Sequence, residues 1–154
     1  MAEWLDTPAL RQWWGDPADQ LALVTEDLDN SLMDQQIGMH GARAFAYLQS
    51  YPCHAWPGGA PQFNDRPQGS HSVDMCIGPP DMLGRGHGAA ILRLYANTLL
   101  ASGATEVVID PAPDNERAVR CYRRAGFRDV AVCPGEDGTP VLVMDFHPEA
   151  ISLT

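Results

Sequence analysis

The stretch LGRGHGAAILRLY, residues 83–95, constrains the fold of this chain more than any other segment. Gly84, Gly86 and Gly88 alternate with larger residues, and a run with helical apolar spacing follows at once. The first N–H groups of a helix lack partners within it, and the helix dipole adds partial positive charge there. Glycine removes the Cβ atoms that would keep a phosphate away from those groups. The stretch therefore predicts a phosphate-binding loop at the start of a helix.

Length and charge exclude several classes of partner. The chain has 154 residues, enough for one domain with a buried core. It carries 10 basic and 20 acidic residues, a net charge of −10. This balance argues against a nucleic acid or an anionic membrane as partner, because both repel an acidic surface. It permits a cationic small-molecule substrate.

The cysteines and the N-terminus indicate a reducing compartment. Cys53, Cys76, Cys121 and Cys133 form no CxxC pair and have no metal-site spacing with the five histidines. This pattern favours free thiols and predicts no metal. We find no apolar run of 18 residues, and the N-terminus MAEWLDTPAL is too acidic for a signal peptide. We therefore expect a cytoplasmic protein.

Periodicity in the N-terminal half predicts helices followed by a hairpin. A helix is predicted over 2–14 and a second over 18–32. The second carries one apolar stripe, made of Leu21, Val24, Leu28 and Leu32. Alternating residues over 35–51 predict two strands that turn at His40-Gly41. The Pro- and Gly-rich segment 52–69 is predicted to be a surface loop and a candidate substrate lid.

The C-terminal half predicts an alternation of strands and helices. A strand over 70–78 precedes the glycine loop and its helix, and TEVVID, residues 105–110, is short and apolar enough to be buried on both faces. A helix over 114–127 should end at Gly126, a left-handed cap. A hairpin around the GEDG turn then closes the fold. The predicted class is α/β, in a single domain.

One interpretation of this order is a dinucleotide-binding unit. Gly84, Gly86 and Ala89 satisfy G-x-G-x-x-G/A, and Asp110 follows at a strand end. That motif requires a strand running straight into the first glycine, whereas the Pro-Pro pair at 79–80 interrupts this one. The chain is also too short for a doubly wound sheet plus a substrate domain. This interpretation is therefore the weaker one.

Two motifs, separated by a helix and an apolar strand, support another interpretation. Residues 83–88 fit Q/R-x-x-G-x-G/A, except that Leu83 replaces the usual Gln or Arg. The second motif, N-x-x-A-x-x-x-Y-x-x-x-G-F, is matched by Asn115, Ala118, Tyr122, Gly126 and Phe127. In this order they resemble the GCN5-related N-acetyltransferase (GNAT) family. The resemblance implies one GNAT domain over 1–154, α/β (α+β), with a central mixed, mostly antiparallel sheet flanked by helices.

Within that superfamily the chain most resembles aminoglycoside 6′-N-acetyltransferases. The shared elements are EWL and WWG near the N-terminus, YLQSY, DPAPDNERAVRCYRRAGF, and a DG turn before the final strand. The segment 52–69 is poorly matched. Such enzymes carry a β-strand before the EWL helix, so either this sequence begins late or the first edge strand is absent, leaving the rim of the sheet less protected.

The resemblance implies acetyl-coenzyme A as cofactor and direct transfer, in a ternary complex, to a primary amine of a small cationic, aminoglycoside-like substrate. Tyr122 would be the general acid that protonates the coenzyme A sulfur, or else a helix residue packed on the sheet. Asp74, on one strand face with Ser72 and Cys76, would be the base. A solvated carboxylate is the alternative for Asp74, and His71 is a weaker base.

The resemblance also implies which residues bind the two substrates. Asp110 and Asp137 would hold ammonium groups together with Asp74, and turn formation is the alternative for Asp110 and for Asp137. Asn115 either contacts the cofactor or caps its helix. The expected cofactor contacts are Met75, Cys76, Ile77, Leu83, Gly84, Arg85, Gly86, His87, Gly88, Asn115, Ala118 and Tyr122. A protein or peptide N-acetyltransferase and a non-catalytic coenzyme A-binding module remain alternatives, in a monomer or homodimer.

Overall fold

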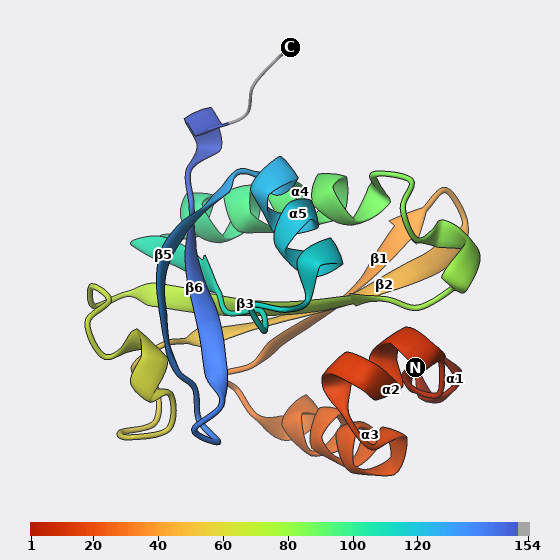
Figure 1. Cartoon of the computed structure of the whole chain (residues 1–154), viewed down its shortest axis with the longest axis horizontal. Helices are drawn as coiled ribbons and strands as arrows, with labels where there is room; N and C mark the ends of the chain where they lie inside the picture. Colours follow the sequence, from red (N-terminus) through yellow and green to blue (C-terminus); the bar gives the residue numbers. More distant parts are fainter. Residues whose placement is uncertain (151–154) are drawn as a thin grey trace.

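A computed structural model describes residues 1–150, whose centre is a six-stranded sheet (Figure 1). The strand order is β1-β2-β3-β4-β6-β5, and every neighbouring pair is antiparallel except β3 and β4. The mixed, mostly antiparallel sheet is therefore confirmed. The strands are β1 (Asp34–His40), β2 (Arg43–Pro52), β3 (Ser70–Ile77), β4 (Glu106–Ile109), β5 (Phe127–Pro134) and β6 (Pro140–Phe146).

Helices cover both faces of the sheet (Figure 1). The helices are α1 (Ala2–Leu5), α2 (Pro8–Trp14), α3 (Pro17–Glu26), α4 (His87–Ala101) and α5 (Glu116–Ala125). On the α4 and α5 side, Leu92 and Tyr95 belong to the largest apolar core. On the other side, Leu5 and Leu10 pack with Tyr47. The apolar periodicity of the sequence thus positions the two layers of helices.

The predicted N-terminal helices were too long. The helix predicted over 2–14 is interrupted at Thr7, whose backbone is extended (φ −70°, ψ 152°). Pro8 explains the break, because proline lacks an N–H and disfavours a helical conformation in the residue before it. The helix predicted over 18–32 ends at Glu26 and is followed by a 3-10 turn. Leu28 and Leu32 are exposed, so the stripe that suggested the longer helix is not buried.

The Pro- and Gly-rich segment 52–69 is a surface loop, as predicted, and a few buried residues anchor it to the sheet. Its 3-10 turn at Pro61–Phe63 buries Phe63 completely. Phe63 belongs to a second apolar cluster, together with Val108 of β4 and Val143 of β6. Cys53 and Ala60 of the same segment are buried in this cluster too, so several side chains hold the loop against the sheet.

The remaining elements agree with the sequence predictions. The hairpin β1–β2 turns at Gly41, and α5 ends at Gly126 in a left-handed conformation (φ 114°). No strand precedes α1 in the part of the chain that the structure describes. Instead, the indole of Trp4 packs against Gly78, directly after β3, so closely that any Cβ on Gly78 would clash with the ring. This contact holds the N-terminal helices against the end of β3.

Candidate active site

The sheet opens where β3 and β4 separate. These strands pair only from Ser70 to Ser72 on β3, and β3 then continues to Ile77 without β4 as a partner. The opening is bordered by the glycine loop and α5 on one side and by α2 on the other. A parallel strand pair that separates in this way leaves backbone groups and a cleft available to ligands.

The glycine loop has the backbone that the sequence predicted. Gly84 and Gly86 have φ of +73° and +82°, a region that other residues rarely adopt. The first hydrogen bond into α4 runs from the Ala90 N–H to the Gly86 carbonyl, at 3.2 Å. The N–H groups of residues 87–89 have no acceptor within the described residues. Three free donors at a helix N-terminus suit an anionic group such as a diphosphate.

A cavity of about 340 Å³ lies beside this loop, in the opening of the sheet. Arg85 and His87 do not line it, so their contact with the cofactor stays a prediction. Gly88 allows α4 to approach α5, because a Cβ there would lie 3.2 Å from the Cys121 sulfur. The other predicted cofactor residues do line it: Met75, Cys76, Ile77, Leu83, Gly84, Gly86, Gly88, Asn115, Ala118 and Tyr122.

Three arginines of α5 add positive charge to this cavity. Arg117, Arg120 and Arg124 all belong to its lining. Sequence reasoning missed them, although their i, i+3, i+7 spacing places them on one side of a helix. Asn115 lines the same cavity and also caps α5, since its Oδ1 accepts from the Ala118 N–H at 3.3 Å. Both predicted roles of Asn115 are therefore compatible.

A second cavity of about 310 Å³ adjoins the first and contains the predicted carboxylates. Asp74 and Asp110 both line it. The two cavities share five lining residues, namely Trp13, Trp14, Met75, Asn115 and Tyr122. The predicted acid, Tyr122, and the predicted base, Asp74, therefore line the same cavity, and Tyr122 also lines the first one.

Each carboxylate is held by a glutamine amide. The Nε2 of Gln49 donates to Asp74 Oδ2 at 2.8 Å, and the Nε2 of Gln62 donates to Asp110 Oδ2 at 2.9 Å. Burial raises the pKa of Asp74. Burial, then the charge of Asp74 and, less strongly, the charge of Glu136 raise the pKa of Asp110 to about 7, and Glu136 also raises the pKa of Asp74. The pair therefore binds a proton near neutral pH.

Tyr122 keeps its proton at neutral pH. Burial raises its pKa well above the ordinary value of 10.0, and the negative charge of Asp74 acts in the same direction. Its side chain also packs against the main apolar core, as the alternative interpretation held. A neutral hydroxyl at the junction of the cavities can donate to an anion that forms beside it.

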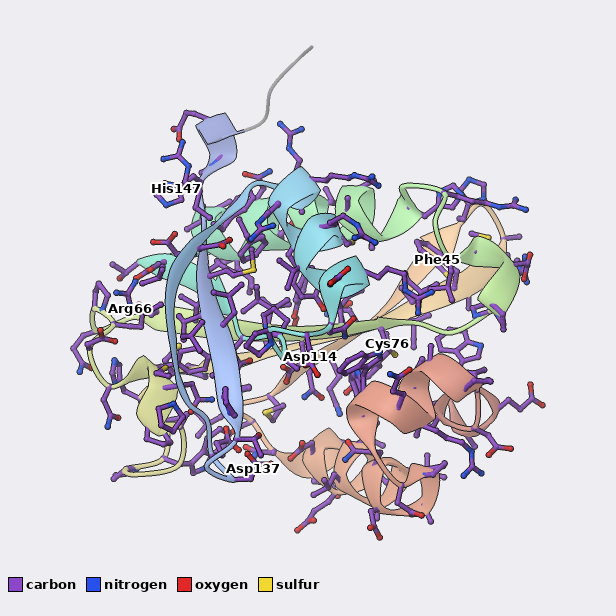
Figure 2. All side chains as sticks on the ribbon, in the orientation of Figure 1. Phe45, Arg66, Cys76, Asp114, Asp137 and His147 are labelled. Carbon is purple, nitrogen blue, oxygen red and sulfur yellow. The ribbon has the colours of Figure 1, made fainter. Side chains whose placement is uncertain are left out.

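Asp137 does not join the other carboxylates. It is exposed on the β5–β6 turn (Figure 2), where its Oδ1 accepts from the Thr139 N–H at 3.0 Å and from the Thr139 hydroxyl at 2.6 Å. These bonds lower its pKa, and it lines neither cavity. The observed contacts are those of turn formation. Its neighbour Glu136 is the residue whose charge reaches Asp74 and Asp110.

Sequence reasoning also missed two tryptophans that line both cavities. Trp13 and Trp14 line both cavities, and Trp14 packs edge-on against Tyr47 with ring centroids 6.3 Å apart. Two consecutive tryptophans at the end of a short helix were the available signal. His71, the weaker candidate base, lines neither cavity, and burial lowers its pKa.

Residues 1–150 contain neither a metal centre nor a membrane-spanning helix. No group of three or more His, Cys, Asp or Glu side chains is placed to hold a metal ion. No helix there has both the length and the apolar character that crossing a bilayer requires.

A family model described as "Acetyltransferase (GNAT) domain" matches residues 1–133. The chain belongs to the GNAT acetyltransferase family. This agrees with the two sequence motifs and disfavours the dinucleotide-binding interpretation, since a 3-10 turn at Pro80–Met82 also separates β3 from the glycines.

Relatives of this GNAT domain cover nearly all of it. The aminoglycoside N(6′)-acetyltransferase type 1 of Klebsiella pneumoniae is 29% identical over 150 residues, which span 92% of this chain and 74% of that protein. The structure of AAC(6′)-Ib with ribostamycin and coenzyme A is 28% identical with a TM-score of 0.82, over 97% of this chain and 87% of that one. The AAC(6′)-Ib complex with coenzyme A and kanamycin is 26% identical with a TM-score of 0.79, covering 97% and 88%.

Proposed function

We propose that this GNAT domain transfers acetyl from acetyl-coenzyme A to a primary amine of a small polycationic acceptor of the aminoglycoside type. The observation that carries the proposal is the pair Asp74 and Asp110, placed in a cavity that meets the cofactor cavity at Tyr122. Two carboxylates in a partly buried cavity favour a ligand with more than one positive charge. The relatives' complexes with kanamycin and ribostamycin support the same acceptor class.

The first cavity fits acetyl-coenzyme A. The free N–H groups of residues 87–89 would bind its diphosphate, and Arg117, Arg120 and Arg124 would offset its negative charge. Met75, Cys76 and Ile77 would contact the pantetheine arm along the part of β3 that β4 leaves unpaired. The cofactor supplies an activated acetyl group at the junction of the cavities.

The second cavity holds the residues that would move protons. Asp74 would accept the proton of the attacking amine, and Tyr122 would donate its hydroxyl proton to the departing sulfur. Asp110 would bind a further ammonium group of the acceptor. Because the cavities adjoin, amine and acetyl group meet directly in a ternary complex, without an acetylated enzyme residue.

The same observations support proposals for the domain organisation, the cellular location and the oligomeric state. We propose that residues 1–154 form one catalytic domain, since a single continuous sheet carries both cavities. A cytoplasmic location suits a consumer of acetyl-coenzyme A with four free cysteines. A monomer or a homodimer would each leave this site complete.

The roles of the two carboxylates can be separated by steady-state kinetics with kanamycin, in which the rate is measured from the release of the coenzyme A thiol. Asp110→Asn should mainly raise KM, because Asp110 binds a charge already present in the ground state, and the loss should shrink at high salt. Asp74→Asn should mainly lower kcat at neutral pH and recover part of it at higher pH, where more amine is neutral.

A panel of simple diamines, spermidine and lysine-containing peptides serves as control for the acceptor class. If the two variants behave alike, the assigned roles are wrong. If peptides react and no polyamine or aminoglycoside does, the acceptor class is wrong and the enzyme is a peptide N-acetyltransferase.

A further inference from the structure

A hydrogen-bonded chain of side chains leads from the N-terminal helices to Asp74. The Gln35 amide donates to the Val24 carbonyl at 3.0 Å and to the Tyr47 hydroxyl at 2.8 Å. The Tyr47 hydroxyl donates to Gln49 Oε1 at 2.8 Å, and Gln49 Nε2 donates to Asp74 Oδ2 at 2.8 Å. We call Gln35, Tyr47 and Gln49 the polar relay.

Strand register explains why these side chains meet. Gln35 of β1 lies opposite Gln49 of β2, and Gln49 lies opposite Asp74 of β3. Tyr47 is two residues from Gln49 on the same strand, so it shares the same face of the sheet. The relay therefore crosses three adjacent strands on the side covered by α1–α3.

The direction of every bond in the relay follows from its first member. The Val24 carbonyl can only accept, so Gln35 must present its NH₂ group there and to Tyr47. Tyr47 accepts from Gln35 and has one hydrogen left, which it gives to Gln49. Burial raises the pKa of Tyr47 to about 12, so this hydrogen is retained at neutral pH. Gln49 then has only its NH₂ group to offer to Asp74.

We propose that Tyr47 and Gln35 are positioning residues for acetyl transfer, which act by locking the Gln49 amide with its NH₂ toward Asp74. A locked donor occupies Asp74 Oδ2 and favours the ionised carboxylate. Oδ1 is then the oxygen presented to the acceptor amine. Neither Tyr47 nor Gln35 lines a cavity, so both act through Gln49. The proposal rests on the proposed role of Asp74 as base.

The relay opposes the burial and the negative charges that raise the pKa of Asp74. The charge of Glu136 from the β5–β6 turn disfavours the ionised form of Asp74, and Asp110 from the end of β4 does the same once it is ionised. Tyr122 from α5 and Tyr51 from β2 are neutral hydroxyls whose own pKa values the charge of Asp74 raises. Burial also raises the pKa of Asp74, and the bond from Gln49 lowers it. The relay thus holds in place the one hydrogen bond that favours the base.

The test compares Tyr47→Phe with Tyr95→Phe in the full chain. Tyr95 is a matched control, because its hydroxyl is also buried and also bonds two side chains, Asp34 and Ser50, but on the α4 face. The readout is the pH profile of kcat/KM with kanamycin. The amine's own titration is common to all variants and cancels in the comparison.

Phenylalanine at position 47 has no hydroxyl that could fix the Gln49 amide. The amide can then turn around, so that its Oε1 accepts a hydrogen bond from a protonated Asp74. Tyr47→Phe should therefore move the acid limb upward by about half to one pH unit and lower kcat about three- to tenfold at pH 6.5. Tyr95→Phe should leave both unchanged. Gln35→Met removes the other end of the relay and should shift the limb in the same direction.

The outcomes separate the relay from the role of Asp74. If Tyr47→Phe is folded and keeps the wild-type acid limb, the relay is refuted. If Tyr47→Phe does not fold, Gln35→Met decides in the same way. If both match the wild type while Asp74→Asn loses kcat, the relay alone is wrong. If Asp74→Asn keeps wild-type kcat at every pH, the base assignment fails and the relay fails with it.

Discussion

Replacing Asp110 by asparagine should stabilise the protein, and the gain should depend on pH. Asparagine keeps the shape of the side chain and an oxygen that accepts from Gln62, but it carries no charge. The pKa of Asp110 is about 7 in the folded protein, against an ordinary 3.8. At 1.36 kcal/mol per pKa unit, ionisation of Asp110 lowers the free energy of unfolding by about 4 kcal/mol. This value is an upper bound, because Asp74 shares the proton.

The sign follows from which state binds the proton more tightly. The folded protein keeps the Asp110 proton up to about pH 7, whereas the unfolded chain releases it near 3.8. Wild-type stability therefore falls as pH rises between these values and levels off above pH 7. Asp110→Asn lacks this loss, so its advantage over wild type should widen by about 2.5 kcal/mol between pH 5 and pH 8.

Urea unfolding at pH 5, 6, 7 and 8 measures this difference without any ligand. Asp137→Asn is the control, since the pKa of Asp137 is lowered by Thr139 and its side chain is exposed. Its stability difference from wild type should stay constant over the same range. A constant difference for Asp110→Asn as well would show that Asp110 is ionised at pH 5, and the buried-pair description would be wrong.

Two further predictions concern the cofactor and the acid. Gly86→Val should abolish thermal stabilisation by acetyl-coenzyme A, because valine rarely adopts the φ of +82° that sets the direction of the free N–H groups. Gly103→Val, at a similar positive φ of +109° but outside the lining of both cavities, should bind the cofactor normally. Tyr122→Phe should lower turnover by about ten- to a thousandfold at nearly unchanged melting temperature, and unchanged turnover would mean that Tyr122 only packs.

The regular elements that the sequence predicted well are those with a strong local signal. Helix α4 has a long apolar stripe, and α5 has Asn115 at its start and Gly126 at its end. The N-terminal helices were overextended because periodicity was followed through Pro8 and beyond Glu26, where the apolar residues are exposed. Local pattern cannot say which apolar side chains find a partner.

The residues of the site likewise divide into those with a local sequence signal and those without one. The glycine loop has a backbone that only certain residues adopt, so it leaves a mark in the sequence. Gln49 and Gln62 leave none, because each acquires its role from a carboxylate 25 or 48 residues away. The hydrogen bonds from Thr139 to Asp137 could not be read from the sequence, because a resemblance transfers positions whereas the direction of a side chain in a turn depends on local contacts.

Selection of a cationic acceptor and activation of the base follow from one property of the second cavity. Asp74 and Asp110 cannot both be ionised at low energy near neutral pH, because both are buried, they repel each other, and the charge of Glu136 adds to the repulsion. An acceptor with two ammonium groups supplies the missing positive charge and lowers both pKa values, so the pair loses its proton as the acceptor binds. A neutral amine provides no such charge and meets a partly protonated pair. If Asp74 is the base, a polycationic acceptor should therefore activate it more strongly than an amine that carries no further positive charge.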